Sequence, residues 1–169
     1  SVLELGCGNG SQTRHNAVFY PAALFYHMAD FSVGMMAEAV NALAGDARFS
    51  FSSHDAQALP FKSASFDLVS ANHMLYHLPD IALGLSEIHR VLKPGGRLVA
   101  ATNGLGHMAD LDALIEAFAP AYQRAHAFHG RFNLENGQGM IMEKFGNCEM
   151  TEYESDLWVS DAEHLTAYV

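Results

Sequence analysis

The chain has 169 residues, half of them hydrophobic and 17% charged, so it can bury the core of one domain. Its 19 acidic residues outnumber its 9 basic ones and give a net charge of −10. The basic residues are scattered, with no stripe that could follow a phosphate backbone, so we expect no nucleic-acid partner. No hydrophobic run approaches the roughly 18–20 residues that span a bilayer, so we expect no membrane partner.

Cysteine content and the start of the chain bear on its origin. The two cysteines, Cys7 and Cys148, are too few for a disulfide framework. There is no signal-peptide pattern, so a reducing, cytoplasmic setting is expected. A predicted strand follows Ser1 directly, which indicates that the sequence is part of a longer protein.

Predicted strands and helices alternate along the first hundred residues, a pattern typical of a parallel sheet with crossover helices. The Pro-Gly-Gly sequence at 94–96 predicts a sharp turn before the fifth strand. Strands are expected at 2–5, 24–29, 48–53, 66–71 and 97–101. Helices are expected at 11–20, between the N-cap Ser32 and Gly45, and after the N-cap Asp80, where Ile81, Leu85, Ile88 and Leu92 form an apolar stripe.

The last third of the chain is less regular. Helices are expected at 107–118, 120–129 and 137–145, and Asp161 is expected to open a final helix. The runs at 148–154 and 157–160 are separated by a short polar turn. They predict an antiparallel strand pair at the edge of the sheet.

Three glycines at alternate positions, Gly6, Gly8 and Gly10, follow the first predicted strand. In an open parallel sheet, ligands bind beyond the carboxyl ends of the strands, and glycine lets the backbone approach a ligand closely. The spacing is G-x-G-x-G rather than the dinucleotide pattern G-x-G-x-x-G. The loop alone is therefore equally consistent with a nucleotide site and with a plain strand-to-helix turn.

Acidic residues, Asp30 and Asp55, stand at the ends of the next two predicted strands. The Asp30 carboxylate could accept hydrogen bonds from both hydroxyls of a ribose, and Asp55 could accept one from an adenine amino group. Phe31 could lie against the adenine ring. Each residue also has a structural interpretation, as a helix-terminal acid, a turn acid or a core aromatic. A glycine loop and two acids at three successive strand ends together favour a nucleotide site.

Four segments resemble, in order and at similar spacing, the motifs of class I S-adenosylmethionine-dependent methyltransferases. They are 2–10 (VLELGCGNG), 55–61 (DAQALPF), 65–69 (SFDLV) and 87–98 (EIHRVLKPGGRL). Together they resemble the ubiquinone/menaquinone-biosynthesis-type subgroup, the methyltransferase 11 family. The resemblance covers roughly residues 2–102.

This resemblance implies a Rossmann-like, doubly wound α/β fold with a seven-stranded, mostly parallel sheet whose last strand is antiparallel. It implies that S-adenosylmethionine binds on the glycine loop and leaves as S-adenosylhomocysteine, with Asp30 at the ribose and Asp55 and Ala56 at the adenine. Asn72 would lie near the methionine end. The expected cofactor-binding residues are Glu4, Gly6, Cys7, Gly8, Gly10, Asp30, Phe31, Ser32, Asp55, Ala56, Gln57, Asn72 and His73.

The resemblance also bears on domain organisation. Residues 1–169 are expected to form a single methyltransferase domain. The N-terminal helices with which the family usually covers the cofactor have no counterpart before Ser1. The segment 107–145 is expected to be a helical insertion or lid on the substrate side, as the family often has there.

Methyl transfer from a sulfonium is an in-line displacement, so the protein mainly positions donor and acceptor and sometimes supplies a base. The candidate catalytic residues are His77, His73 and Tyr76, with His77 the first choice for a polar anchor or base, and one helical turn here would place both histidines on one face. The alternative for each histidine is a buried, hydrogen-bonded side chain or a cap. His126 and His129 have no cysteine or carboxylate at ligand spacing, so we expect no metal site.

The acceptor is expected to be a small, neutral or cationic molecule in a largely apolar pocket. Two other functions stay open: an S-adenosylmethionine-binding domain without catalysis, and a nicotinamide-dependent oxidoreductase, which would leave Asp55 unexplained. A homodimer is also left open. The expected pocket walls are 72–77, 103–107 with His107 as a further polar candidate, and helices carrying Met108, Leu111, Phe118 and Phe128.

Overall fold

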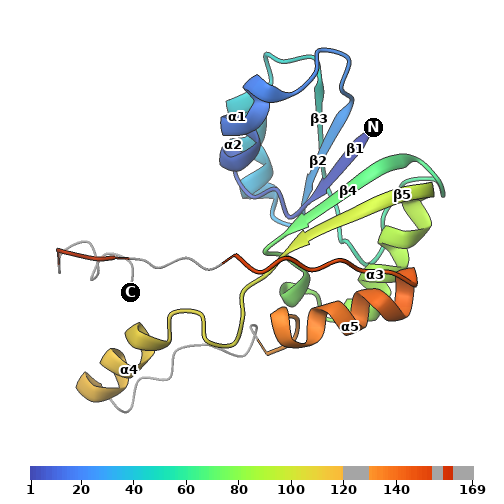
Figure 1. Ribbon diagram of the computed structural model, residues 1–169. Helices are drawn as coiled ribbons and strands as arrows, with labels where there is room; N and C mark the ends of the chain where they lie inside the picture. Colours follow the sequence, from blue (N-terminus) through green and yellow to red (C-terminus); the bar gives the residue numbers. More distant parts are fainter. Residues whose placement is uncertain (120–129, 154–157, 162–169) are drawn as a thin grey trace.

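The computed structural model describes residues 1–119, 130–153 and 158–161 and has an α/β architecture. Its described part contains one sheet of five parallel strands in the order β3-β2-β1-β4-β5 (Figure 1). The sheet confirms the predicted α/β class and the parallel arrangement. The strands are β1 Val2–Leu5, β2 Tyr26–Asp30, β3 Phe49–Ser53, β4 Phe66–Asn72 and β5 Leu92–Ala101.

Helices cover both faces of the sheet. Helices α1 and α2 lie on one face, over a core around Met28 and Met36, while α3 and α5 lie on the other, over a core around Leu3 and Ile88 (Figure 1). Helix α4 extends away from the sheet. The helices are α1 Ser11–Asn16, α2 Val33–Leu43, α3 Ile81–Val91, α4 Ala109–Phe118 and α5 Leu134–Phe145, with 3-10 turns η1 Ala17–Phe19 and η2 Leu75–His77.

Local sequence explains where the two main crossover helices begin. The Ser32 hydroxyl accepts the Met35 N–H at the start of α2, and the Asp80 carboxylate accepts the Leu83 N–H at the start of α3. Both predicted N-caps are therefore confirmed. Of the predicted stripe, Leu85 and Ile88 are buried on α3 and Ile81 is partly buried, whereas Leu92 is buried but already belongs to β5. The predicted helix 11–20 is instead split, because α1 ends at Asn16 and continues as the 3-10 turn η1.

Strand β5 starts earlier than predicted, and the expected turn at 94–96 is wrong. Phe66 pairs with Leu92 and Leu68 pairs with Arg97, so a step of two residues in β4 faces a step of five in β5. The extra residues form a bulge inside β5, where Gly95 has a φ of 78°. A proline without an N–H and a left-handed glycine interrupt the pairing without ending the strand.

The C-terminal third also departs from expectation. Helix α5 begins at Leu134 rather than at 137, because Asn133 and Asn136 form a reciprocal capping box. The predicted antiparallel strand pair is absent from the described residues, since 147–153 and 158–161 form no strand. Side chains in these segments are largely exposed, so no buried face fixes a strand register. The seven-stranded sheet is thus not confirmed, and the predicted helices at 120–129 and after Asp161 lie outside the described residues.

Among the described helices, none is long and apolar enough to span a bilayer. The described part likewise contains no group of three or more His, Cys, Asp or Glu side chains that could hold a metal ion. His126 and His129 lie outside the described residues.

A buried carboxylate joins β1 to its neighbours. Glu4 is only 5% exposed, and its Oε2 accepts hydrogen bonds from the hydroxyls of Thr13 on α1 and Tyr26 on β2. Burial raises the pKa of the Glu4 carboxyl above its ordinary value, although the two hydroxyl bonds lower it in part. The charged form of Glu4 is therefore held at a cost in stability.

We predict that the free energy of unfolding of Glu4→Gln increases relative to that of wild type as pH rises from 4 to 8. The folded-state pKa of Glu4 is raised, so wild type loses stability as pH rises through that value, whereas glutamine does not titrate. Urea unfolding at several pH values measures the difference in free energy of unfolding. Glu38→Gln, at an exposed position on α2, controls for the change in net charge. A free energy of unfolding of Glu4→Gln that falls relative to that of wild type as pH rises would contradict the prediction.

Candidate functional site

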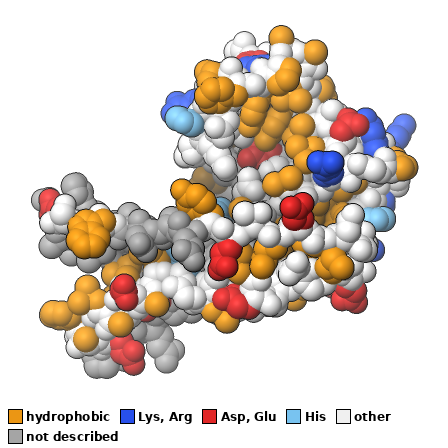
Figure 2. Space-filling view, viewed as in Figure 1, with side chains coloured by type: hydrophobic (Ala, Val, Ile, Leu, Met, Phe, Trp, Pro, Cys, Tyr) orange, Lys and Arg blue, Asp and Glu red, His pale blue; other side chains and the backbone are white. Residues whose placement is uncertain are grey.

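The carboxyl ends of β1 to β4 bring together the segments that carry the predicted site residues. These are the glycine loop after β1, the Asp30–Ser32 turn after β2, the Asp55–Gln57 turn after β3 and the segment after β4. In the space-filling view, α4 projects as an arm from the body of the molecule that carries the sheet (Figure 2). The sheet order therefore places the four segments side by side.

The glycine loop has a backbone that other residues would strain. Gly6, Gly8 and Gly10 have φ values of 68°, 56° and 75°, in the left-handed region. A Cβ on Gly6 would lie 2.5 Å from the Cβ of Met74, so this glycine is also required by close packing. A Cβ on Gly8 would meet no atom within 4 Å. The loop backbone thus favours glycine at all three positions, and it leaves space above Gly8.

Asp30 fixes this loop to the neighbouring turn. Its Oδ2 accepts the Gly8 N–H and its Oδ1 accepts the Ser32 N–H, both at 2.8 Å. Each carboxylate oxygen has a further lone pair, so Asp30 can still accept the hydroxyls of a ribose. Phe31 is 78% exposed beside it, which leaves its ring free to lie against a ligand. Sequence reasoning placed Asp30 at the site but not its bond to Gly8.

Cys7, predicted as a cofactor contact, lies buried in the loop, and its Sγ contacts the Met36 sulfur at 3.5 Å. Burial, followed by the nearby carboxylates of Glu4 and Asp30, raises the pKa of the Cys7 thiol to about 12. The side chain is thus a neutral thiol rather than a nucleophile. The carboxylates of Glu4 and the amide of Asn72 likewise have protein partners, with the Asn72 Nδ2 donating to the Ser70 Oγ at 3.2 Å.

The turn after β3 is organised around Asp55. Its Oδ1 accepts the Gln57 backbone N–H at 2.8 Å, and both of its oxygens accept from the Gln57 side-chain amide. The Gln57 Oε1 in turn accepts the Asp80 backbone N–H at 2.8 Å. The Ala56 side chain is buried in the core. Gln57 is predicted to contact the cofactor, but its side chain instead joins Asp55 to the start of α3.

Two residues of α3, Glu87 and Arg90, also contact the connection between β3 and β4. The sequence analysis gave them no role beyond membership of a motif. Glu87 accepts the Leu59 N–H, and Arg90 donates to the carbonyls of Leu59 and Phe61. The sequence offers one signal for this role: a Glu-Arg pair spaced i, i+3 on a helix that follows a crossover without a helix. Without coordinates, such a pair is equally typical of an exposed helix surface.

The segment after β4 does not form the single helical turn considered above. His73 has a φ of 52° and its N–H bonds to the Ala101 carbonyl at 2.8 Å, after which η2 forms a 3-10 turn. His73 and His77 therefore do not share an α-helical face. The Tyr76 ring lies 4.5 Å from the His77 ring, and burial raises the pKa of the Tyr76 hydroxyl. Left-handed backbone at a non-glycine residue is often found at functional sites.

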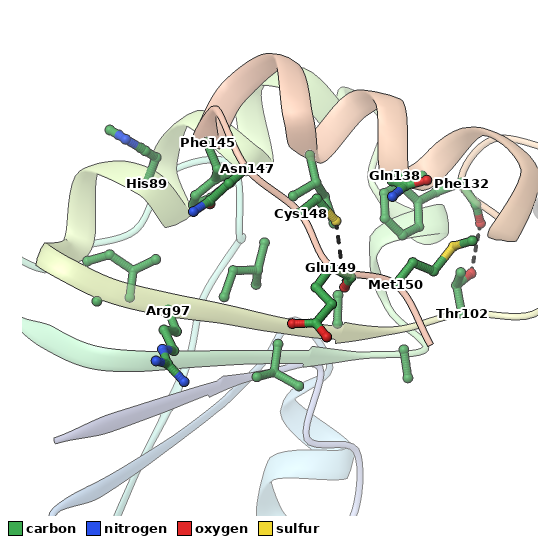
Figure 3. Close-up of a pocket in the computed structure, with 18 of the residues that line it drawn as sticks. His89, Arg97, Thr102, Phe132, Gln138, Phe145, Asn147, Cys148, Glu149 and Met150 are labelled. Atoms are coloured by element: carbon green, nitrogen blue, oxygen red, sulfur yellow. Dashed lines mark hydrogen bonds between the residues drawn. The ribbon is translucent and has the colours of Figure 1, made fainter. Parts of the chain in front are cut away.

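An open groove of about 1730 Å³ runs beside β5. At its carboxyl end it is lined by His73, Asn103 and His107, three of the residues predicted for the acceptor side. Figure 3 shows Cys148, Glu149 and Met150 between α5 and β5, and a hydrogen bond of 2.9 Å from the Thr102 hydroxyl to the Phe132 carbonyl. The glycine loop, both strand-end acids and His77 do not line this groove.

The described residues of the predicted insertion 107–145 include two helices, α4 and α5, which have different surroundings. Helix α5 packs against α3 and belongs to the layer that covers the sheet. Helix α4 extends from the body, with Leu111 buried and Phe118 86% exposed. Its role as a lid stays a prediction, and Phe128 lies outside the described residues.

Comparison with known proteins places this arrangement in a family. The demethylmenaquinone methyltransferase of Clavibacter sepedonicus is 40% identical over 98 residues, 58% of this chain and 39% of that protein. The malonyl-(acyl-carrier protein) O-methyltransferase of Legionella pneumophila is 28% identical over 155 residues, 92% of this chain and 50% of that protein. The chain thus spans half or less of the length of these relatives.

A solved structure agrees with these sequence matches. Haemonchus contortus phosphoethanolamine N-methyltransferase 2, in complex with S-adenosyl-L-methionine, matches with a TM-score of 0.63 and 26% identity, over 85% of this chain and 32% of that one. The methyltransferase domain family matches residues 3–100. This match covers more than half of the chain, including β1 except Val2, all of β2 to β4, nearly all of β5 and the loops that follow β1 to β4, so the chain belongs to the methyltransferase 11 family.

Proposed function

We propose that this chain binds S-adenosylmethionine and belongs to an enzyme that transfers its methyl group to a small molecule. The observation that carries the proposal is the left-handed glycine loop held by Asp30 at the carboxyl edge of the sheet. This edge is where open parallel sheets bind ligands. Family membership and relatives named as methyltransferases support it.

Different residues on this edge would contact different parts of the cofactor. Asp30 would accept the two ribose hydroxyls, and Asp55 would accept the adenine amino group while the Ala56 N–H meets a ring nitrogen. Phe31 would cover one face of the adenine. Gly8 leaves the space in which the ribose and methionine portions can approach the backbone.

The acceptor side is proposed to lie at the carboxyl end of the groove beside β5. S-adenosylmethionine supplies a methyl group already activated for displacement, so the chain mainly has to hold the acceptor in line and exclude water. His73 lies on this groove together with Asn103 and His107, which gives the acceptor polar anchors. Relatives named as acting on a menaquinone precursor, malonyl-(acyl-carrier protein) and phosphoethanolamine support a small-molecule acceptor group.

Binding of S-adenosylhomocysteine should raise the melting temperature of the chain, whereas NAD should not. A ligand that binds only the folded state stabilises it by about 2.7 kcal/mol at a hundredfold excess over its Kd. Thermal unfolding followed by circular dichroism measures the shift. A shift with NAD and none with S-adenosylhomocysteine would favour the oxidoreductase alternative and contradict the proposal.

Asp30→Ala should weaken S-adenosylhomocysteine binding more than Asp55→Ala. Asp30 would make two charge-assisted hydrogen bonds of about 1.5–3 kcal/mol each and also holds Gly8, whereas Asp55 would make one such bond. Titration calorimetry gives the two Kd values. Equal or reversed losses would show that the ribose and adenine ends of the site are misassigned.

His73→Ala should lower turnover about tenfold or more. His73 lines the groove and His77 does not, so we assign the acceptor-side role to His73, in place of the cofactor contact expected for it and of the choice of His77 from sequence. The affinity for S-adenosylmethionine should then stay nearly unchanged, because a group that acts only on the acceptor affects the chemical step. His77→Ala, outside the groove, should have a smaller effect. Methyl transfer from labelled S-adenosylmethionine to the acceptors of the named relatives provides the assay. A larger loss for His77→Ala would assign the polar anchor to His77, and no turnover with any acceptor would favour a binding domain without catalysis.

A further inference from the structure

The crossover from β3 to β4, residues 54–65, has no helix. A connection between parallel strands usually contains a helix, which satisfies the backbone N–H and C=O groups internally. In this crossover the backbone N–H and C=O groups need partners from other elements of the chain. The crossover also carries Asp55 and the buried Leu59. Its conformation therefore depends on the elements that it contacts.

Helix α3 supplies several of these partners. The carbonyls of its residues Arg90 and Val91 accept the N–H groups of Ala64 and Ser65 at the end of the crossover, and one ion pair holds the middle of the crossover. The Glu87 Oε2 accepts the Leu59 N–H at 2.8 Å, and the Arg90 guanidinium donates to the carbonyls of Leu59 at 2.9 Å and Phe61 at 2.7 Å. The two side chains also bond to each other, with Arg90 Nε to Glu87 Oε1 and Arg90 Nη2 to Glu87 Oε2, both at 2.7 Å. Arg90 thus holds two carbonyls and a carboxylate at once, which the planar fork of a guanidinium allows and a lysine ammonium does not match.

The fixed part of the crossover continues directly into the turn with Asp55. The Ala58 N–H donates to the Asp55 carbonyl at 3.0 Å, and Gln57 joins the Asp55 carboxylate to the Asp80 N–H at the start of α3. Helix α3 therefore holds the crossover near its N-terminus through Gln57 and near its C-terminus through the ion pair. The direction of the Asp55 carboxylate is set between these two points.

We propose that the Glu87–Arg90 pair is a positioning device for adenine recognition, which holds Asp55 where it can accept the adenine amino group. The inference rests on the proposed function, because it presupposes that adenine binds at Asp55. Arg90 acts through the backbone of Leu59 and Phe61 and is a positioning residue, not a ligand contact. It explains why a helix-free crossover can present a carboxylate in a defined direction.

The test compares two ligands that differ only at the adenine. S-adenosylhomocysteine has the 6-amino donor, whereas S-inosylhomocysteine has a 6-oxo acceptor that faces the Asp55 carboxylate unfavourably. Wild type should therefore prefer the adenine compound by about tenfold or more in Kd. In Arg90→Gln this preference should fall by about fivefold, because Asp55 loses its fixed direction. Lys144→Gln, at an exposed position on α5, should keep the wild-type preference and controls for the lost positive charge.

The ratio of the two Kd values separates positioning from general stabilisation. A merely structural ion pair would lower the melting temperature and weaken both ligands equally, so an unchanged ratio in Arg90→Gln would overturn the inference. If Arg90→Gln does not fold, Glu87→Gln takes its place, since it keeps an acceptor for the Leu59 N–H but removes the charge that holds Arg90; its ratio should also fall. Wild type that binds neither compound would overturn the proposed function and this inference together, whereas a wild-type preference that survives in the variants would overturn this inference alone.

Discussion

The Asp30 carboxylate accepts backbone N–H groups from two loops that leave neighbouring strands, and the candidate site depends on this contact. One N–H comes from Gly8 after β1 and the other from Ser32 at the start of α2. A parallel sheet aligns strand ends but leaves the loops beyond them free to move. The carboxylate converts that alignment into a fixed distance between the glycine loop and the next turn. Ser32 then caps α2, so the same contact also sets where this helix begins.

The two faces of the sheet serve the site differently. On one face, α1 and α2 hold the glycine loop, with Glu4 joining β1 to α1 through Thr13. On the other face, α3 holds the crossover that carries Asp55. The expected ribose and adenine contacts are thus supported by separate layers of the protein. A substitution in one core should accordingly disturb one end of the cofactor site more than the other.

Much of this arrangement could be predicted, because strand-end positions follow from the alternation of strands and helices. Asp30, Asp55 and the three glycines were placed correctly at one edge on that ground alone. The direction of a side chain carries no such pattern: Gln57 could face a ligand or a neighbouring backbone, and only the fold shows that it reaches Asp80. The Pro-Gly-Gly sequence at 94–96 was misassigned for a similar reason, since the same residues suit a turn and a bulge, and the neighbouring strand decides between them.

The bulge in β5 has a mechanical consequence for the far end of that strand. From Gly96 to Ala101 the strand advances by five residue steps, about 17 Å of extended chain, and the groove residues Thr102 and Asn103 follow directly. A bulge increases local twist, so it helps to set the direction in which β5 runs toward the wall of the groove. A Cβ on Gly96 would lie 2.9 Å from the Lys93 carbonyl oxygen, so the bulge has little room for a larger residue at this position. The course of β5, which pairing with β4 then maintains from Arg97 to Ala101, ties the carboxyl end of the groove to the residues 94–96 at the other end of the strand.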